Sequence, residues 1–461
     1  MEDLYRYIDE NRERFVEELL RLVEQPSVST SGEGIEDFGR LLAGFMKDAG
    51  VQAEILPTDY QPLICGKVSG ADSGRNLLFL DHYDVVPAGP LENWANPPFQ
   101  PVIKDNRIWA RGVGDPKGQL YAYIKAVEAF RKVRGILPVN INMAFFGDDE
   151  IGIPSLKYVL SNYRDRFNGE AAIWADASTL DYWGPAVILG SRGVLAFELK
   201  ASGAKFEAHS GSYGGLLRNP AIRLAHAIAA LRDPDGRILV PGFYEHLRPL
   251  GKDEKVLLAN LKVDKESKLR SLGTTEFWGD PDHDYFEIQQ YRPTLNVHGL
   301  TSGYQGENWT MMVPSSATAK IDVNIVAHLD PVDLLAKIRK HLDANDFRDI
   351  EIKELAHSIA FEWSKPGDPF LDLVARAMKR VWNKETVMYP SIGGGGSIGP
   401  GVKDELGIPY FLVVPLGQPD MNEHSSRESL DIDWYINGIK SVATIIDEFA
   451  VSDIGKRTTE R

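Results

Sequence analysis

The chain has 461 residues, and its 51 Lys and Arg against 66 Asp and Glu give a formal net charge of −15 at pH 7. Because 43% of the residues are hydrophobic and 25% are charged, the composition is that of a globular protein, and the length predicts two or three domains. The acidic balance argues against nucleic acid or an anionic membrane as a partner, since both attract clustered Lys and Arg.

The first residues and the cysteine content predict a cytoplasmic location. Cys65 is the only cysteine, which excludes an intramolecular disulfide. The N-terminal sequence MEDLYRYIDENRERF is too polar for a secretory signal, and no apolar run approaches the ~20 residues that span a bilayer. Apolar residues from Leu4 to Val23 instead recur with the period of one amphipathic helix.

Short apolar runs then alternate with helical patterns up to about residue 193. Strands are expected over residues 76–80, 139–146 and 171–175, and helices over residues 118–132 and 155–163. This alternation is typical of an α/β domain with a mostly parallel, doubly wound sheet.

The pattern changes at about Val194. Strands are then expected over residues 194–202, 317–325 and 350–355, and helices over residues 220–231 and 331–342. A strand-helix-strand-strand-helix-strand order on one antiparallel sheet predicts an inserted α+β domain, in which residues 233–284 form an extra insertion. The α/β style returns with a helix over 369–382, a strand over 409–414 and a helix over 432–449. We therefore predict a discontinuous first domain, residues 1–193 and 358–461, and an inserted second domain, residues 194–357.

Potential metal ligands follow three of the predicted strands. In chain order they are His82 with Asp84, Asp149 with Glu150, and Asp176. Because sites in open α/β sheets form at the carboxyl ends of strands, these side chains should converge. Two further candidates are Asp115, in a Gly-rich turn that opens a helix, and His424, after the strand at 409–414.

Each of these residues also has an ordinary structural explanation. Carboxylates at strand ends often cap helices, and a single His after a strand is often a hydrogen-bonded structural residue. Several convergent carboxylates would repel one another, however, unless a cation neutralised them. Carboxylate and imidazole ligands suit zinc, and a bridging carboxylate would hold two ions ~3.5–4 Å apart.

Further motifs occur in order along the chain. They are His82-x-Asp84-Val85-Val86-Pro87, Trp94 with Pro98-Phe99, Arg111-Gly112 to Lys117-Gly118, Asp149-Glu150-Ile151-Gly152, Arg192-Gly193, His209-Ser210-Gly211 with Gly214-Gly215, and His424-Ser425. On these motifs the chain resembles the zinc exopeptidase family that contains glutamate carboxypeptidase, carnosinase-like dipeptidases, aminoacylase and succinyl-diaminopimelate desuccinylase. The resemblance covers nearly the whole chain, and the long insertion is most similar to the larger dipeptidase branch.

The resemblance implies two Zn²⁺ ions as cofactors, with Mn²⁺ or Co²⁺ as substitutes. His82 and Asp176 would bind one ion, Glu150 and His424 the other, and Asp115 would bridge them. It also implies that the discontinuous domain is catalytic and that the inserted domain is a lid and dimerisation domain.

The same resemblance assigns catalytic roles. Asp149 would be the general base, Asp84 would fix the tautomer of the His82 ring, and His209 would enter the partner's active site in a homodimer and stabilise the oxyanion. The family base is usually Glu, so the shorter Asp149 would impair catalysis unless the backbone shifts. The family places a cis peptide after the bridging Asp, and since Pro116 lowers the cost of that geometry, we predict a cis Asp115–Pro116 bond.

Substrate contacts are expected from a glycine-rich loop and from the inserted domain. The loop residues are Gly394, Gly395 and Gly396, and the inserted domain offers Asn296 and Asn324. Asn324 stands where the family has an Arg that binds the substrate's terminal carboxylate. Because an amide cannot supply a charged bidentate fork, recognition of a free C-terminus would need another cation, such as Arg292 or Lys320.

We therefore predict a two-zinc hydrolase that cleaves an amide bond of a dipeptide or short peptide with a metal-activated water. Two alternatives remain, an N-acyl amino acid amidohydrolase of the same family and a catalytically weakened metal-binding homologue. A cysteine-dependent amidase is disfavoured, because Cys65 lies in an apolar strand without a paired His motif.

Overall fold

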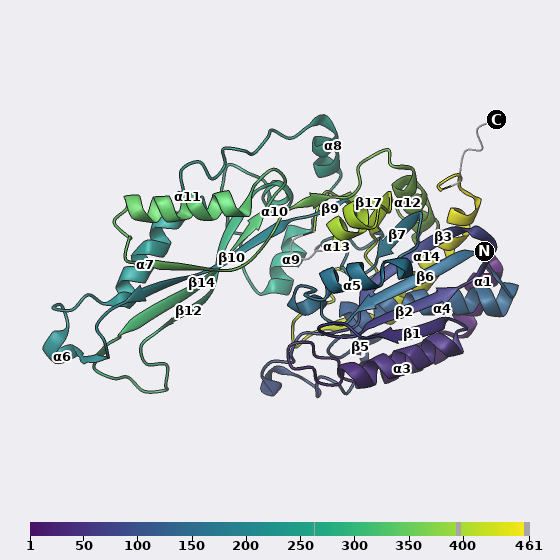
Figure 1. The fold of residues 1–461 in the computed structure, drawn as a ribbon, viewed down its shortest axis with the longest axis horizontal. Helices are drawn as coiled ribbons and strands as arrows, with labels where there is room; N and C mark the ends of the chain where they lie inside the picture. The colour runs from purple at the N-terminus through teal and green to yellow at the C-terminus, as the bar shows by residue number, and fades with distance from the viewer. Residues whose placement is uncertain (262, 393–397, 456–461) are drawn as a thin grey trace.

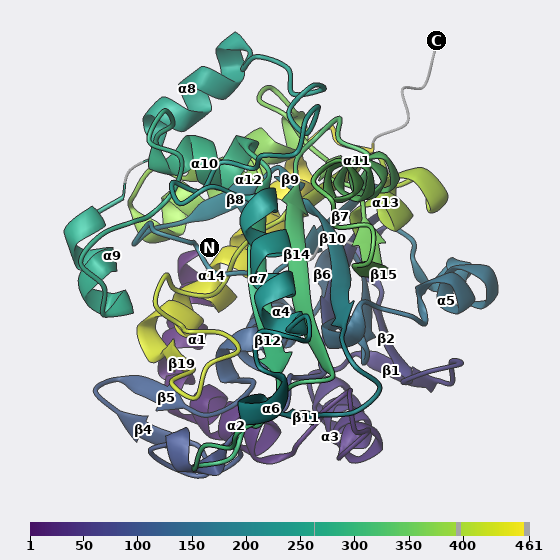
Figure 2. The ribbon, with the colours of Figure 1, turned by 90° about the vertical axis from the view of Figure 1, so that its left-hand side faces the viewer.

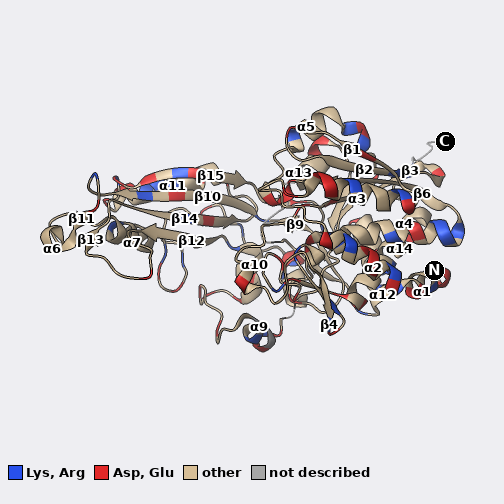
Figure 3. Cartoon of the chain, turned by 90° about the horizontal axis from the view of Figure 1, so that it is seen from below, with Lys and Arg blue, Asp and Glu red and all other residues tan. Residues whose placement is uncertain are grey.

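The computed structural model describes residues 1–261, 263–392 and 398–455. It has a larger lobe built on an eight-stranded sheet and a smaller lobe that projects from it, built on a four-stranded sheet (Figure 1). Acidic and basic residues are interspersed along outer helices such as the long helix of the smaller lobe (Figure 3), as expected for a solvated surface. Among the described residues, no helix combines the length and apolar character needed to cross a bilayer.

The central sheet of the larger lobe is mixed. Its strands lie in the order β1 (Gln52–Leu56), β2 (Leu63–Val68), β6 (Leu137–Phe146), β3 (Gly70–His82), β7 (Ala171–Trp174), β18 (Tyr410–Val413), β8 (Ala186–Ile188) and β17 (Val387–Tyr389). The pairs β6–β3, β3–β7, β7–β18 and β8–β17 are parallel, whereas β1–β2, β2–β6 and β18–β8 are antiparallel. The predicted parallel arrangement thus holds at the centre of the sheet, and antiparallel pairs lie toward its edges.

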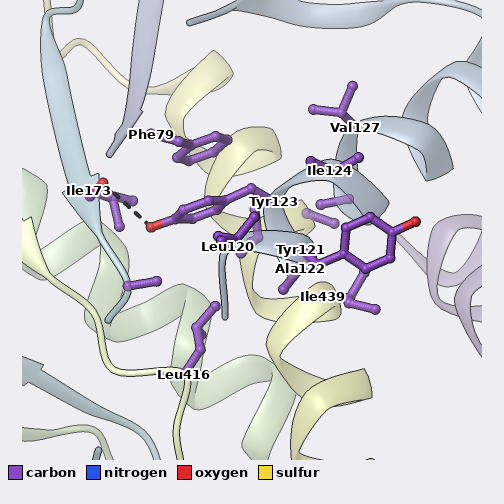
Figure 4. Packing of buried hydrophobic residues seen from close by; sticks show 14 of the residues in the cluster. Phe79, Leu120, Tyr121, Ala122, Tyr123, Ile124, Val127, Ile173, Leu416 and Ile439 are labelled. Atoms are coloured by element: carbon purple, nitrogen blue, oxygen red, sulfur yellow. Dashed lines mark hydrogen bonds between the residues drawn. The ribbon is translucent and has the colours of Figure 1, made fainter. Parts of the chain in front are cut away.

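Helices cover both faces of this sheet. They are α1 (Glu2–Glu10), α2 (Arg12–Glu24), α3 (Ile35–Asp48), α4 (Gly118–Arg134), α5 (Leu156–Asn162), α12 (Pro369–Trp382), α13 (Ile398–Pro400) and α14 (Ile432–Val451). Successive residues of β3 point to opposite faces, so Phe79 joins one hydrophobic cluster and Leu80 the other. In the first cluster, Phe79 stacks on Tyr123 of α4 with ring centroids 4.4 Å apart (Figure 4).

The first helical segment differs from its prediction. A single helix was expected from Leu4 to Val23, but the structure has α1 and α2, separated at Asn11. The Asn11 side chain donates to the Tyr7 carbonyl oxygen at 2.8 Å and accepts from Arg14 Nε at 3.2 Å. Asn favours such local side-chain bonds at helix ends, and the break lies at this residue. The apolar spacing persists because both helices bury their faces in the same core.

The smaller lobe contains the predicted antiparallel sheet. Its strands lie in the order β12 (Thr294–Ser302), β14 (Ser316–Ile325), β10 (Gly193–Ser202) and β15 (Glu351–Ser358), and α7 (Pro220–Leu231) and α11 (Pro331–Ala344) lie side by side on it (Figure 2). The strand-helix order is the one predicted from the sequence. The distal tip carries β11 (Ala208–His209), α6 (Ser210–Tyr213) and β13 (Met312–Val313).

The insertion between α7 and β12 returns to the larger lobe. It contains α8 (Lys252–Asn260), α9 (Lys265–Leu272) and α10 (Tyr285–Tyr291). Leu261 and Phe286 of this segment pack into the hydrophobic cluster that contains Leu80. The proposed domain boundaries at residues 193 and 358 assign this segment to the inserted domain, although it packs in the core of the larger lobe. These boundaries therefore stay a proposal.

Short elements complete the larger lobe. They are β4 (Val102–Lys104), β5 (Arg107–Trp109), β9 (Gly190–Ser191), β16 (Phe361–Glu362) and β19 (Ser429–Asp431), with the single turns η1 (Leu91–Asn93), η2 (Val113–Lys117), η3 (Asp149–Ile151), η4 (Arg164–Arg166) and η5 (Gly401–Glu405). Two of these turns, η2 and η3, carry residues of the candidate site.

Candidate metal centre and active-site cavity

The candidate ligands converge at the carboxyl edge of the central sheet. His82 ends β3, Glu150 lies in η3 directly after β6, and Asp176 follows β7. Because β6, β3 and β7 are neighbouring parallel strands, their ends meet at one edge. Asp115 reaches this edge from η2, and His424 reaches it from the loop after β18.

These five side chains form two groups that share one residue. In the first group, His82 Nε2 lies 3.4 Å from Asp115 Oδ1 and 3.2 Å from Asp176 Oδ2. In the second, His424 Nε2 lies 3.1 Å from Asp115 Oδ2 and 3.1 Å from Glu150 Oε2. The candidate ligand atoms of each group lie within 4.8 Å of one another. The structure thus brings together all five predicted residues, and Asp115 turns a different oxygen to each group.

The protonation of these groups reflects crowded carboxylates. Burial, together with the Asp115 charge, raises the pKa of Asp176 to about 7. Hydrogen bonds to Asp115 and Glu150 raise the pKa of His424 to about 11. Bound cations would replace the protons that these shifts retain, so the site fits divalent metal ions. Carboxylate oxygen and imidazole nitrogen are ligands that zinc accepts.

Asp84 contacts the site from its buried side. It is fully buried, and its Oδ1 lies 3.2 Å from His82 Nδ1. The same carboxylate accepts the backbone N–H of Asp149 at 3.1 Å and of Glu150 at 3.0 Å. A proton on Nδ1 leaves Nε2 of His82 free to face the carboxylates, which is the tautomer predicted for a metal ligand.

The loop that carries Asp115 is fixed by Glu428, for which the sequence motifs predict no role. The Asp115–Pro116 bond is cis, as predicted. The buried Glu428 carboxylate accepts Arg111 Nη1 at 2.6 Å and the backbone N–H groups of Gly112, Gly114 and Asp115 at 3.0 to 3.1 Å. The available sequence signal was the position of Glu428, four residues after His424. The groups that it accepts from, in residues 111–115, lie more than 300 positions earlier in the chain, so the sequence did not connect them.

The cavity above these groups has a volume of about 510 Å³. Its described lining contains the five candidate ligands, Asp149 and an apolar wall that includes Trp174, Trp363 and Phe411. Asp149 Oδ2 lies 3.9 Å from His82 Nε2, and burial raises the pKa of Asp149 to about 8. The predicted base is therefore at the cluster.

The other predicted residues lie elsewhere. His209 is exposed on β11, at the tip of the smaller lobe. Asn296 donates to Asp322 Oδ1 and Asn324 to Thr294 Oγ1, both at 3.2 Å, and neither is part of the described cavity lining. Their strands belong to the sheet of the smaller lobe, which explains the separation. Gly394, Gly395 and Gly396 lie outside the described residues.

Residues 78–448 match the model of peptidase family M20/M25/M40. The chain belongs to this family. It is 27% identical to the Cys-Gly metallodipeptidase dug1 of Schizosaccharomyces pombe, over 98% of both chains, and 25% identical to the Beta-Ala-His dipeptidase of Rattus norvegicus, over 99% of this chain and 97% of that one. The M20 family metallo-carboxypeptidase Sso-CP2 from Sulfolobus solfataricus superimposes with a TM-score of 0.85 at 28% identity, over 95% of this chain and 99% of that one.

Membership of the M20 family confirms the resemblance inferred from the motifs and the α/β fold with its added antiparallel sheet. It makes the chain a hydrolase that acts on peptide bonds and uses divalent metal ions. The two candidate ligand groups of this M20 peptidase are the described residues that could hold such ions.

Proposed function

We propose that this M20 peptidase is a dipeptidase that holds two zinc ions and hydrolyses the amide bond of a dipeptide or short peptide. The observation that carries the proposal is the Asp115 carboxylate, whose two oxygens face two separate ligand groups. Such a carboxylate is suited to bridge two cations. Mixed oxygen and nitrogen ligands favour zinc, and Mn²⁺ or Co²⁺ are expected to substitute.

The substrate class is supported by two relatives. The chain aligns over almost its full length with proteins named as Cys-Gly and Beta-Ala-His dipeptidases. The cavity volume of about 510 Å³, with an apolar wall of Trp174, Trp363 and Phe411, suits a small substrate. No nucleic acid or membrane partner is part of the proposal, and we keep the expectation of a cytoplasmic location.

The proposed mechanism assigns each polar group near the cluster a task. When bound, zinc would polarise the scissile carbonyl and acidify the attacking water. Asp149 would take the proton of that water and deliver it to the leaving amine. Burial raises the pKa of Asp149 to about 8, and the positive charge of bound ions would lower it toward the range in which the carboxylate can accept a proton near neutral pH. Asp84 would keep His82 in the tautomer that presents Nε2, while its hydrogen bonds to the Asp149 and Glu150 amides position the base.

The test of this function is an assay of the purified protein with added Zn²⁺, Mn²⁺ or Co²⁺ against dipeptides, tripeptides and N-acyl amino acids. We expect dipeptide turnover that Asp149→Asn abolishes while metal content stays at two ions per chain. Turnover of acyl amino acids alone would favour the amidohydrolase alternative. Two bound metals without any turnover would favour the weakened homologue, and the Asp149→Glu variant would then show whether the shorter base is responsible.

We further propose a homodimer in which His209 completes the partner's active site. His209 is exposed and directly precedes α6, which lies at the far tip of the smaller lobe, whereas β3, β6 and β7, whose ends carry the cluster, lie in the larger lobe (Figure 1). Mixing His209→Ala chains with Asp149→Asn chains should regain activity, because a mixed dimer contains one intact site. A dimer by ultracentrifugation that gains no activity on mixing would contradict the role of His209, and a monomer would contradict the dimer.

A further inference from the structure

An arginine that is buried and has no carboxylate partner among the described residues lines the active-site cavity. Arg192 lies between β9 and β10 and is 6% exposed. Its Nη1 donates to the Gln289 carbonyl oxygen at 2.8 Å and its Nη2 to the Arg292 carbonyl oxygen at 2.6 Å. Its Nε has no hydrogen-bond acceptor among the described residues. Both hydrogen bonds therefore go to neutral backbone carbonyls, and further N–H groups of the guanidinium can still donate.

In the described part of the chain, no carboxylate pairs with the charge of Arg192. Burial alone lowers the pKa of Arg192, to about 10, so the side chain stays charged at neutral pH. The buried Arg111 offers a contrast, because its Nη1 lies 2.6 Å from Glu428. A buried cation is costly unless it is paired. Arg192 is a buried cation of this costly kind, and it lies on the wall of the cavity that both candidate ligand groups also line.

The other cations considered for substrate binding are placed differently. The Arg292 guanidinium lies over the Tyr244 ring at 5.0 Å, and Lys320 is exposed on β14. Asn324 donates to Thr294 and carries no charge. Among these four residues, Arg192 alone belongs to the described lining of the cavity.

We propose that Arg192 binds a carboxylate group of the substrate and makes this M20 peptidase selective for anionic peptides. The inference rests on the proposed function, because it concerns the same cavity. The guanidinium is held in place by two backbone carbonyls and is shielded from water, so little reorganisation opposes binding of a carboxylate. The carboxylate is either the free C-terminus or an acidic side chain of the peptide.

Substrate pairs separate these two sources. The first pair is a dipeptide with a free C-terminus and its C-terminal amide, and the second is a dipeptide with a Glu residue and its Gln counterpart. A charged hydrogen-bonded pair corresponds to about a 10- to 100-fold preference in kcat/KM. A preference confined to the first pair identifies the terminal carboxylate, and one confined to the second identifies the side chain. Equal kcat/KM within both pairs would overturn the proposal.

Variants of Arg192 test whether the preference belongs to this residue. For the preferred member of the pair, Arg192→Gln should raise KM about 10- to 100-fold with little change in kcat, and the preference should disappear. Arg192→Lys keeps the charge but loses the planar fork, so it should retain part of the preference. Arg292→Gln is the matched control, because it removes a nearby cation that faces Tyr244, and it should retain the whole preference.

Two outcomes would contradict the role of Arg192 and one would contradict the function itself. Arg192→Gln that keeps the wild-type preference, or that lowers kcat/KM equally for both members of a pair, would show a purely structural residue. Metal content and thermal unfolding identify variants that do not fold, and Arg192→Lys then carries the test. Absence of turnover with every substrate by metal-loaded wild type would instead defeat the proposed dipeptidase, since the selectivity test requires turnover.

Discussion

Replacement of Asp84 by Asn tests how the structure holds two candidate ligands and the proposed base in place. The side chain is fully buried, and its two oxygens accept from His82 Nδ1 and from the backbone N–H groups of Asp149 and Glu150. Asn has the same shape but only one acceptor oxygen. If the amide nitrogen of the introduced Asn faces the Glu150 backbone N–H, two donors oppose each other. If it faces His82 Nδ1 instead, that nitrogen must accept, and the ring is driven to the tautomer that carries its proton on Nε2, the atom that faces the carboxylates.

The magnitude follows from the contacts that are lost. A buried hydrogen bond to a charged group contributes about 1.5–3 kcal/mol. Loss of one such bond corresponds to about a 10- to 100-fold weaker interaction, since each tenfold change equals about 1.4 kcal/mol. Outer partners of metal ligands show losses of the same size in metal affinity or activity. We therefore expect Asp84→Asn to weaken metal binding about 10- to 100-fold and to lower kcat/KM at limiting metal by a similar factor.

The assay is titration of the chelator-treated protein with Zn²⁺ and Co²⁺ by calorimetry, followed by kinetics at defined free metal. Asp148→Asn is the matched control, because Asp148 is also fully buried but, among the described residues, its side chain accepts from the Ser155 amide and hydroxyl alone, each at 2.9 Å. That control should lose thermal stability and keep its metal affinity. Wild-type metal affinity and kcat/KM in Asp84→Asn, or an equal loss of affinity in both variants, would refute the reasoning.

Three further perturbations probe the surroundings of the site. Glu428→Gln should lower kcat/KM about 10-fold or more because it weakens the anchor of the Asp115 loop, while the exposed neighbour Arg427→Gln should not; equal kinetics of the two variants would contradict this. Burial lowers the pKa of Lys117 to about 7 from 10.5, so at this residue the unfolded chain binds more protons between these values, and the contribution of Lys117 to stability should rise with pH there. Urea unfolding of the wild type and of Lys117→Met at pH 7.5 and 9.5 isolates this contribution, because the other titrating groups are common to both; the wild type should gain stability relative to the variant at the higher pH, and a difference that does not change with pH would count against it. Chelation should lower the thermal midpoint and added zinc should restore it, because the clustered carboxylates repel without a cation; an unmoved midpoint would argue against a site at this cluster.

Much of the fold follows from local patterns. The helices predicted over 220–231 and 369–382 match α7 and α12, because apolar spacing and a proline at the start mark both. The break at Asn11 escaped the prediction, since α1 and α2 bury their faces in one core and preserve the apolar spacing across it. Periodicity reports which face is buried and does not report whether the backbone hydrogen bonds are continuous.

The sequence by itself determined which residues meet at the site. Ligands that follow parallel strands converge as a consequence of sheet geometry, and the motifs place His82, Asp115 and Asp176 without coordinates. Tertiary structure alone decided what surrounds them. Glu428 reaches the Asp115 loop across 313 positions, and Arg192 acquires its charge imbalance only because the returning insertion supplies neutral carbonyls in place of a carboxylate. Such contacts depend on how segments that are distant in the sequence pack together, and this packing produces no periodic pattern in the sequence.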